Sequence, residues 1–245
     1  MLPRILAFGF LLGTVAILGA DQPAPPKKSP REALQAVGDL VGTWNGTGTP
    51  FGTLEDKQKG FWTEKMEWGW KFKDKDAWMV VNFEKSKSFS AGELRYVPEK
   101  DHFTLTLTTP KKEKITYVGT IETRDKTNIL TLDREQDKES HRLVFTFLHS
   151  NRFLYRYEVK PDGRPLYAKK WSVGATKEGE PFAVGRSRPE CIVSGGTGTS
   201  TVSHMGKTYY VCCSGCRDEF NAAPAKYVKE YEEKLAKAKK KKKKK

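Results

Sequence analysis

Cysteine is absent from the first 190 residues of this 245-residue chain. The apolar run at residues 5–20 is therefore not followed by a cysteine, which excludes attachment of a lipid at that point. The run is also too short and too rich in glycine for a spanning helix, which needs about 20 apolar residues. A single charge before it, Arg4, and the small pair Gly19 and Ala20 at its end are typical of a secretory signal peptide. We expect residues 1–20 to be removed and the mature protein to be periplasmic or secreted.

Outside the C-terminus the positive and negative charges nearly balance, although the formal net charge of the whole chain is +14. Lys234, Lys237 and the lysines at 239–245 supply nine of these charges and Arg4 a tenth, which leaves +4 for residues 21–233. Such a balance excludes a specific nucleic-acid partner for the body of the protein. A run of like charges cannot bury itself, so residues 233–245 are expected to form a disordered lysine-rich tail. Its partners would be the cell envelope or another anionic polymer, bound weakly by electrostatics.

Residues 37–180 carry an almost continuous β pattern. A Pro-rich linker at 21–36 precedes them and already contains a helix start at Ser29 and Pro30. Alternating segments such as FWTEKMEWGWKF and HFTLTLTT are separated by turn residues at short, regular spacing. The pattern predicts nine or ten antiparallel strands in a closed meander barrel, which leaves no strand edge unpaired. A two-sheet sandwich is the alternative architecture.

The opening of this segment, LVGTWNGTGT, holds Gly42, Trp44, Gly46 and Gly48. A short helix followed by Gly-x-Trp resembles the lipocalin-like (calycin) barrels, and G-x-W-x-G-x-G is similar to the start of the nitrobindin-like haem-binding barrels. The resemblance covers roughly residues 30–178. It implies that Trp44 closes one end of the barrel and that the glycines let the first strand bend there.

A barrel of this size can hold one small ligand. Glu64 lies on the same face of its strand as several tryptophans, so its carboxylate is expected inside the barrel. A buried carboxylate needs a partner of opposite charge or a hydrogen-bond donor, and Lys169 is the candidate. In the alternation of inner and outer residues along its strand, His149 falls on the inner face, so it is the second candidate for contact with a ligand. His102 and His141 are expected to be solvated. The histidine that haem-binding relatives carry near the C-terminal strand has no counterpart, which argues against haem. No serine, cysteine or paired-carboxylate arrangement for catalysis stands out, so we expect a binding protein and not an enzyme.

All four cysteines lie in a second module at residues 189–232, the cysteine module, which a linker at 181–188 joins to the barrel. Cys191 precedes Cys212 and Cys216 with the spacing C-x20-C-x3-C. Between them we expect a β-hairpin with its turn at Gly206-Lys207, and after them a helix interrupted at Pro224. The spacing brings thiols from a loop and from a helix start together, and a helix N-terminus lowers the pKa of a thiol.

This stretch resembles the YHS and TRASH family of small metal-binding modules, through CIVSGG, GKTYYVCCSGC and EFNAAPAKY. The resemblance implies that Cys191, Cys212 and Cys216 are metal thiolates. Ser194 stands where many members carry another cysteine. Three or four soft ligands suit one zinc or copper ion.

The fourth ligand remains open between Cys213, His204 and a solvent molecule. Two other chemistries are also open, because an exported chain with an even cysteine count can form disulfides. One is a ligand-carrier barrel with a disulfide-stapled module, and the other a thiol–disulfide redox protein that uses Cys213 and Cys216. The sequence as a whole favours the interpretation that this is an exported metal-binding protein, for storage, sensing or delivery of zinc or copper in the envelope.

Overall fold

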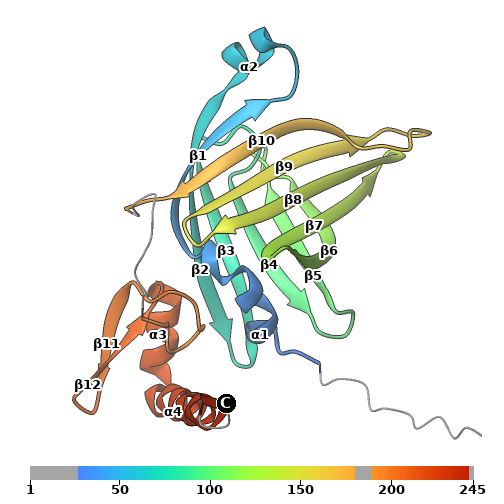
Figure 1. Cartoon of the computed structure of the whole chain (residues 1–245). Coiled ribbons are helices and arrows are strands. Elements are labelled where there is room, and N and C mark those ends of the chain that lie inside the picture. Colours follow the sequence, from blue (N-terminus) through green and yellow to red (C-terminus); the bar gives the residue numbers. More distant parts are fainter. Residues whose placement is uncertain (1–26, 180–188, 243–245) are drawn as a thin grey trace, which may run out of the picture.

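Ten antiparallel strands close into one barrel in the computed structural model, which describes residues 27–179 and 189–242 (Figure 1). Each strand pairs with its neighbours in the sequence, and the first strand closes the sheet against the last. The mainly β fold and the meander barrel are confirmed, and the sandwich alternative is wrong. The predicted signal peptide and the linker at 181–188 fall outside the described residues. The strands are β1 (Gly42–Pro50), β2 (Trp62–Lys73), β3 (Asp76–Glu84), β4 (Ala91–Val97), β5 (His102–Thr108), β6 (Lys114–Arg124), β7 (Thr127–Gln136), β8 (Glu139–His149), β9 (Arg152–Lys160) and β10 (Ala168–Lys177).

Two-residue turns connect β6 to β7 and β7 to β8. Asp125 and Lys126 form the first, with φ of 47° and 67°, and Asp137 and Lys138 the second, with φ of 51° and 65°. Left-handed conformation at both central residues is the type I′ geometry, whose twist matches that of the flanking strands. These turns keep consecutive strands in register without glycine.

One end of the barrel is closed by α1 (Pro30–Leu34) and the 3₁₀ helix Gln35–Leu40. A capping box between Ser29 and Glu32 starts α1, as the sequence predicts. Trp44 is 1% exposed, donates its indole N–H to the Leu40 carbonyl at 2.6 Å and meets the Phe153 ring edge-on at 4.7 Å. Leu34 is fully buried in the same core, so α1 packs against the barrel at this end.

Two glycines of β1 face large side chains of the neighbouring strand β2. A Cβ on Gly48 would lie 2.0 Å from the Trp62 ring, and one on Gly46 would lie 3.0 Å from the Glu64 side chain. The missing side chains therefore make room for the large inner residues of β2. A helix that the sequence did not reveal, α2 (Leu54–Gly60), follows β1 and stands at the barrel end opposite α1 (Figure 1).

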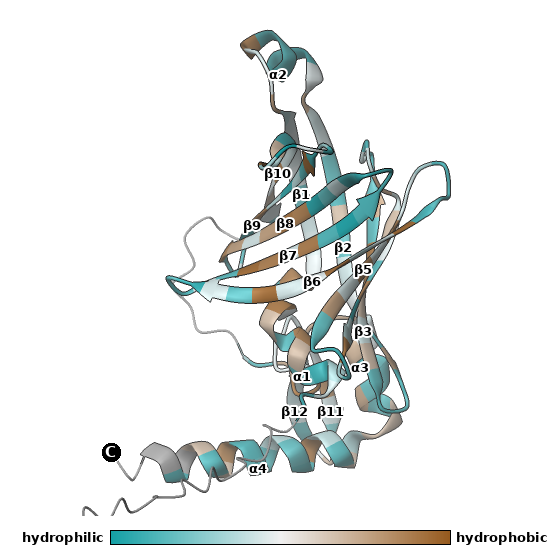
Figure 2. Ribbon diagram, turned by 90° about the vertical axis from the view of Figure 1, so that its right-hand side faces the viewer, coloured by the Kyte–Doolittle hydropathy of each residue, from teal (hydrophilic) through white to brown (hydrophobic). Residues whose placement is uncertain are grey.

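The cysteine module consists of the hairpin β11 (Ser200–His204) and β12 (Lys207–Val211), then α3 (Ser214–Ala222) and α4 (Pro224–Lys242). The hairpin turn is Met205-Gly206, one residue earlier than predicted, and both residues have positive φ. Helix α4 continues to Lys242, so the prediction of a disordered tail is wrong for residues 233–242. Most of α4 is hydrophilic (Figure 2).

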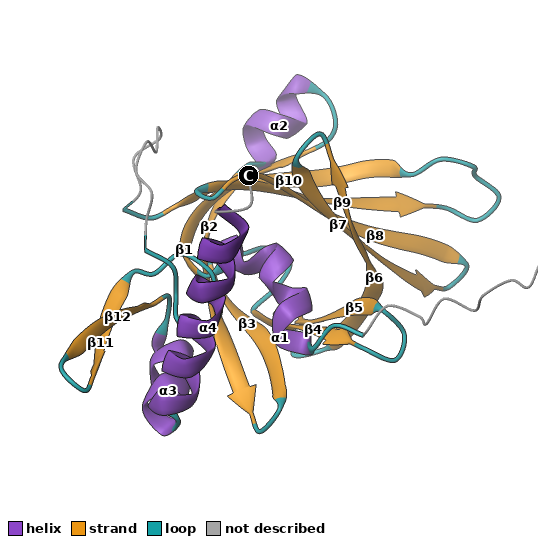
Figure 3. Cartoon of the chain, turned by 60° about the horizontal axis from the view of Figure 1, so that its bottom comes forward, coloured by secondary structure: helices purple, strands orange, loops and turns teal. Residues whose placement is uncertain are grey.

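The module and the barrel share one hydrophobic core cluster. Helices α1, α3 and α4 gather at the same end of the barrel (Figure 3). Helix α3 approaches β2 closely at Gly215, where an added Cβ would lie 1.9 Å from the Trp70 carbonyl oxygen. Within residues 27–179 and 189–242, no helix is long and apolar enough to span a membrane.

Candidate metal centre

Three cysteines meet in the cysteine module. Their Sγ atoms lie within 4.8 Å of one another, and the residues are 1%, 6% and 0% exposed for Cys191, Cys212 and Cys216. Cys191 comes from the loop before the hairpin, Cys212 follows β12, and Cys216 lies in the first turn of α3. These are the three ligands that the sequence predicts, and the fold brings them together. All four cysteines of the chain are free thiols.

A tight loop positions the first sulfur. The Cys191 N–H donates to the Gly196 carbonyl at 2.6 Å, and the Gly195 N–H donates back to the Cys191 carbonyl at 2.9 Å. This loop turns through Gly195, which has a φ of 78°. A parallel bridge between Cys191 and Tyr210 then attaches the loop to β12. The loop therefore holds Cys191 beside the end of the strand that carries Cys212.

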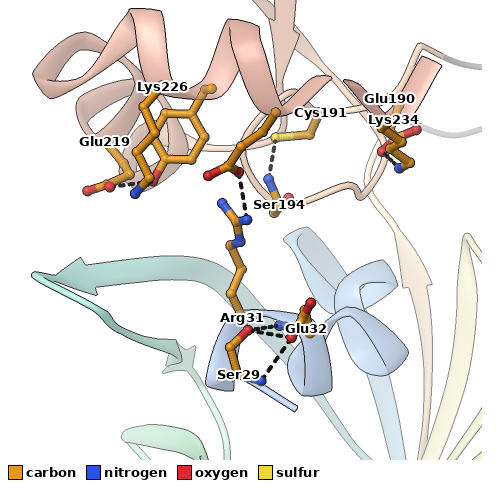
Figure 4. Close-up of polar contacts among 11 residues, drawn as sticks. Ser29, Arg31, Glu32, Glu190, Cys191, Ser194, Glu219, Lys226 and Lys234 are labelled. Atoms are coloured by element: carbon orange, nitrogen blue, oxygen red, sulfur yellow. Dashed lines mark hydrogen bonds and ion pairs between the residues drawn. The ribbon is translucent and has the colours of Figure 1, made fainter. Parts of the chain in front are cut away.

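Ser194 contacts two of the sulfurs. Its backbone N–H donates to Cys191 Sγ at 3.4 Å (Figure 4), and its hydroxyl lies 3.3 Å from Cys212 Sγ. The residue is 1% exposed. Ser194 stands where the related modules carry a cysteine. It still lies against the sulfur cluster, as a hydrogen-bonding group and not as a thiolate. Its spacing of three from Cys191 is the signal that could have shown this.

Hydrogen bonds among the sulfurs shift their pKa values apart. Bonds from Cys212 and Cys216 lower the pKa values of Cys191 and Cys213 well below that of an ordinary thiol. The pKa values of the donors Cys212 and Cys216 are raised, first by their bond to Cys191 and further by burial. A cation that binds all three sulfurs must displace the protons of these two thiols. Metal binding is therefore expected to release protons.

The donor set fits a soft metal ion. Metal–sulfur bonds of about 2.3 Å place the sulfurs around one ion about 4 Å apart. Cys212 Sγ and Cys216 Sγ lie 3.5 Å apart, and no pair in the group exceeds 4.8 Å. Movements of about 1 Å or less would let all three sulfurs bind one ion. Thiolate ligands select Zn²⁺ or Cu(I) over hard cations.

The two candidates for a fourth ligand lie at different places. Cys213 Sγ is 4.0 Å from Cys212 Sγ but is not part of the three-sulfur group. His204 pairs with Lys207 beside the hairpin turn, whereas Ser200 pairs with Val211 next to Cys212. Four residues of strand separate these pairs, or about 13 Å. His204 therefore does not join the sulfurs, and its ring lies edge-on to Phe220 instead.

Inside the barrel, Glu64 is buried as predicted, at 4% exposed. Its partners are the Tyr155 hydroxyl and the Trp62 indole N–H, the latter at 2.8 Å, and not Lys169. Lys169 is exposed because a bulge between Lys169 and Trp171 places them on opposite faces of β10. Burial and the neighbouring carboxylate raise the pKa of Tyr155, so its hydroxyl keeps its proton as the donor.

The two histidines of β8 are placed the opposite way from the prediction. His149 is exposed, because a bulge between Phe147 and His149 turns it away from the inner face. His141 is the more enclosed of the two: it is half-buried, with 13% of its side chain exposed, and its Nδ1 lies 2.6 Å from the Tyr157 hydroxyl. Burial, with the charge of Arg134, lowers the pKa of His141. His149 therefore lies outside the barrel interior.

Comparison with known proteins adds little. No protein-family model matches the chain, and no curated protein matches it. Among solved structures, the crystal structure of Rv2717c from M. tuberculosis matches with a TM-score of 0.40 and 16% identity, over 60% of this chain and 97% of that chain. None of these comparisons indicates a function for the chain.

Proposed function

We propose that the protein binds one soft metal ion, zinc or copper(I), through Cys191, Cys212 and Cys216. The observation that carries the proposal is the convergence of three buried thiols within 4.8 Å. Buried thiols have little reason to cluster in an apolar setting unless they bind an ion or form a disulfide, and all of these are free. The predicted signal peptide supports a place in the periplasm or outside the cell. A binding role in envelope metal storage, sensing or delivery, without catalysis, follows from this combination.

Titration of the reduced, metal-free protein tests this function. Zn²⁺ and Cu(I) are added separately against a chromophoric chelator, and we expect one ion per chain. Cys191→Ser should abolish tight binding, because it removes one of three thiolates. His204→Ala is the matched control and should bind as the unchanged protein does, since His204 lies at the far end of the hairpin. If the protein with four titratable thiols binds neither ion, the proposal fails.

Thiol–disulfide exchange is the competing chemistry of the same sulfurs. The sequence suggests Cys213 with Cys216 for this chemistry, and in the structure Cys212 and Cys216 are also close enough, at 3.5 Å between Sγ atoms, to be oxidised after a small movement. Counting free thiols and metal in protein purified from its native compartment distinguishes the two. Metal with four free thiols supports the binding function. Disulfides without metal, together with insulin-reducing activity that requires these cysteines, would replace it.

A small-molecule carrier is the second candidate function, and the polar aromatic layer inside the barrel favours it. Trp171 contacts Tyr155, Tyr157 and Trp62 at ring distances of 5.5, 5.4 and 6.0 Å, beside the buried Glu64. Such aromatic walls with a few polar groups suit a flat organic ligand. A ligand released on denaturing the purified full-length protein, and identified by mass spectrometry, would support this role. Its absence from protein prepared without harsh washing would count against it.

A further inference from the structure

Cys213 differs from the other three cysteines in both exposure and surroundings. It is half-buried, whereas Cys191, Cys212 and Cys216 are buried. It lies outside the three-sulfur group, with its Sγ 4.0 Å from that of Cys212. A thiol in this position is close enough to reach an ion held by the group and is the most accessible of the four.

The barrel fixes this sulfur. The backbone N–H of Trp70, in β2, donates to Cys213 Sγ at 3.4 Å, although the two residues are 143 positions apart. The contact between Gly215 and the Trp70 carbonyl brings α3 close enough for this bond. A hydrogen bond of this kind stabilises a sulfur that carries negative charge. Cys213 is therefore held next to the cluster by a group that favours its thiolate.

We propose that Cys213 is the exchange ligand, through which a soft metal ion passes between the buried thiolates and an outside acceptor. This inference rests on the proposed metal-binding function. In the first step the Cys213 sulfur bonds to the ion as a thiolate. The bond from Cys212 to the ion then breaks and leaves that sulfur as the free thiolate, so that neither the total charge nor any oxidation state changes. An acceptor thiolate or chelator can next bind the ion on the Cys213 side.

The physical reason is the burial of the other ligands. An ion bound by three buried sulfurs can leave unaided only by breaking bonds where no water or acceptor replaces them. A fourth sulfur at 4.0 Å offers a stepwise route in which a new bond forms as an old one breaks. The proposal predicts a kinetic role for Cys213 with little effect on equilibrium affinity.

Release kinetics of the full-length protein loaded with Zn²⁺ test the proposal. Loading is measured first, and the ion is then transferred to increasing concentrations of a chromophoric chelator in a stopped-flow instrument. In Cys213→Ser, transfer should be slower by about tenfold or more, a barrier increase of about 1.4 kcal/mol. Equilibrium affinity should change by less than about tenfold, the smallest loss expected when a contact around a metal is removed. Ser214→Ala, an exposed neighbour, is the control and should transfer at the unchanged rate.

Cys213→Ala is measured alongside, because a serine oxygen could itself bind the ion weakly. Both variants should load one ion and both should transfer it slowly. An unchanged transfer rate overturns the exchange role while leaving the metal site intact. A large loss of affinity overturns it as well, since Cys213 would then be a permanent fourth ligand. If the unaltered protein takes up no Zn²⁺ at all, the proposed function fails before the exchange role is reached.

Discussion

Arg31 and Glu230 join the two ends of the described chain, with Nη2 of the guanidinium 2.8 Å from the Glu230 carboxylate. Arg31 lies on α1, which closes the barrel, and Glu230 lies on α4 of the cysteine module. The guanidinium also lies over the Tyr227 ring, 5.6 Å from its centroid. With the contact between Trp70 and Cys213, this pair fixes the module at two points on the barrel. The two parts are therefore expected to unfold with partial cooperativity.

A double-mutant cycle of Arg31→Ala and Glu230→Ala should give a coupling energy of about 0.5–1 kcal/mol, at the upper end for a partly exposed ion pair. The measurement is the free energy of unfolding in denaturant. Glu55 and Lys59 on α2 form a control pair whose side chains are 71% and 77% exposed, and their coupling should be smaller. If the coupling energy of Arg31 and Glu230 is no larger than that of the control pair, their ion pair does not help to hold the cysteine module on the barrel.

Gly215→Ala should separate the module from the barrel, because the new Cβ would lie 1.9 Å from the Trp70 carbonyl oxygen. The expected result is loss of hydrogen-exchange protection at the Trp70 amide and a lower melting temperature. Gly69→Ala is the control, since a Cβ there meets nothing within 4 Å. A variant at 215 that keeps the protection of Trp70 would show that the close approach is not maintained in solution.

Trp44→Ala should destabilise the barrel by about 3–5 kcal/mol, as the loss of a fully buried aromatic side chain does. The indole fills the closed end and bonds to Leu40, and alanine would leave a cavity there. Trp78→Ala is the comparison, because Trp78 is half-buried under the guanidinium of Arg95 and should cost much less. Chemical denaturation of both variants measures their free energies of unfolding. An equal loss of stability in the two would contradict the assignment of Trp44 as the residue that closes the barrel.

The metal-free protein should lose stability as the pH falls below about 6.5, the pKa of histidine in an unfolded chain. Burial lowers the pKa of His141 in the folded protein, so over this range the unfolded state binds the additional proton more readily. The free energy of unfolding therefore decreases until the pH reaches the folded pKa. His141→Gln should flatten the profile between pH values of about 7 and about 5. A profile that the substitution leaves unchanged would show that His141 titrates alike in both states.

The regular strands explain how much of the barrel could be predicted. In β2 inner and outer residues alternate without a break, so the sequence correctly predicts that Glu64 and its neighbouring tryptophans face the barrel interior. The same rule failed for His149 and Lys169. Each lies next to a bulge, where one extra residue reverses which face the following side chains occupy. Nothing in the local composition marks these two bulges, because they arise from how neighbouring strands fit around the closed barrel.

The sulfur site shows a similar division. The order of loop, hairpin and helix start predicts that distant cysteines come together, and the resemblance to the YHS and TRASH modules implies that these are Cys191, Cys212 and Cys216. The place of Cys213 could not be predicted, since it depends on Trp70, a residue 143 positions earlier in another part of the fold. His204 was proposed from its nearness in sequence, but the register of the hairpin puts it at the opposite end.

The two type I′ turns of the barrel have a consequence for heat resistance. Lys126 and Lys138 hold left-handed conformations that cost a residue with a side chain about 1 kcal/mol each. Glycine would adopt the same geometry without that cost, although it also gains freedom in the unfolded chain. These exposed positions are distant in sequence from the sulfur cluster. Variants that survive higher temperature can therefore be sought at the rim of the barrel, in the turns between β6, β7 and β8, without altering the thiols.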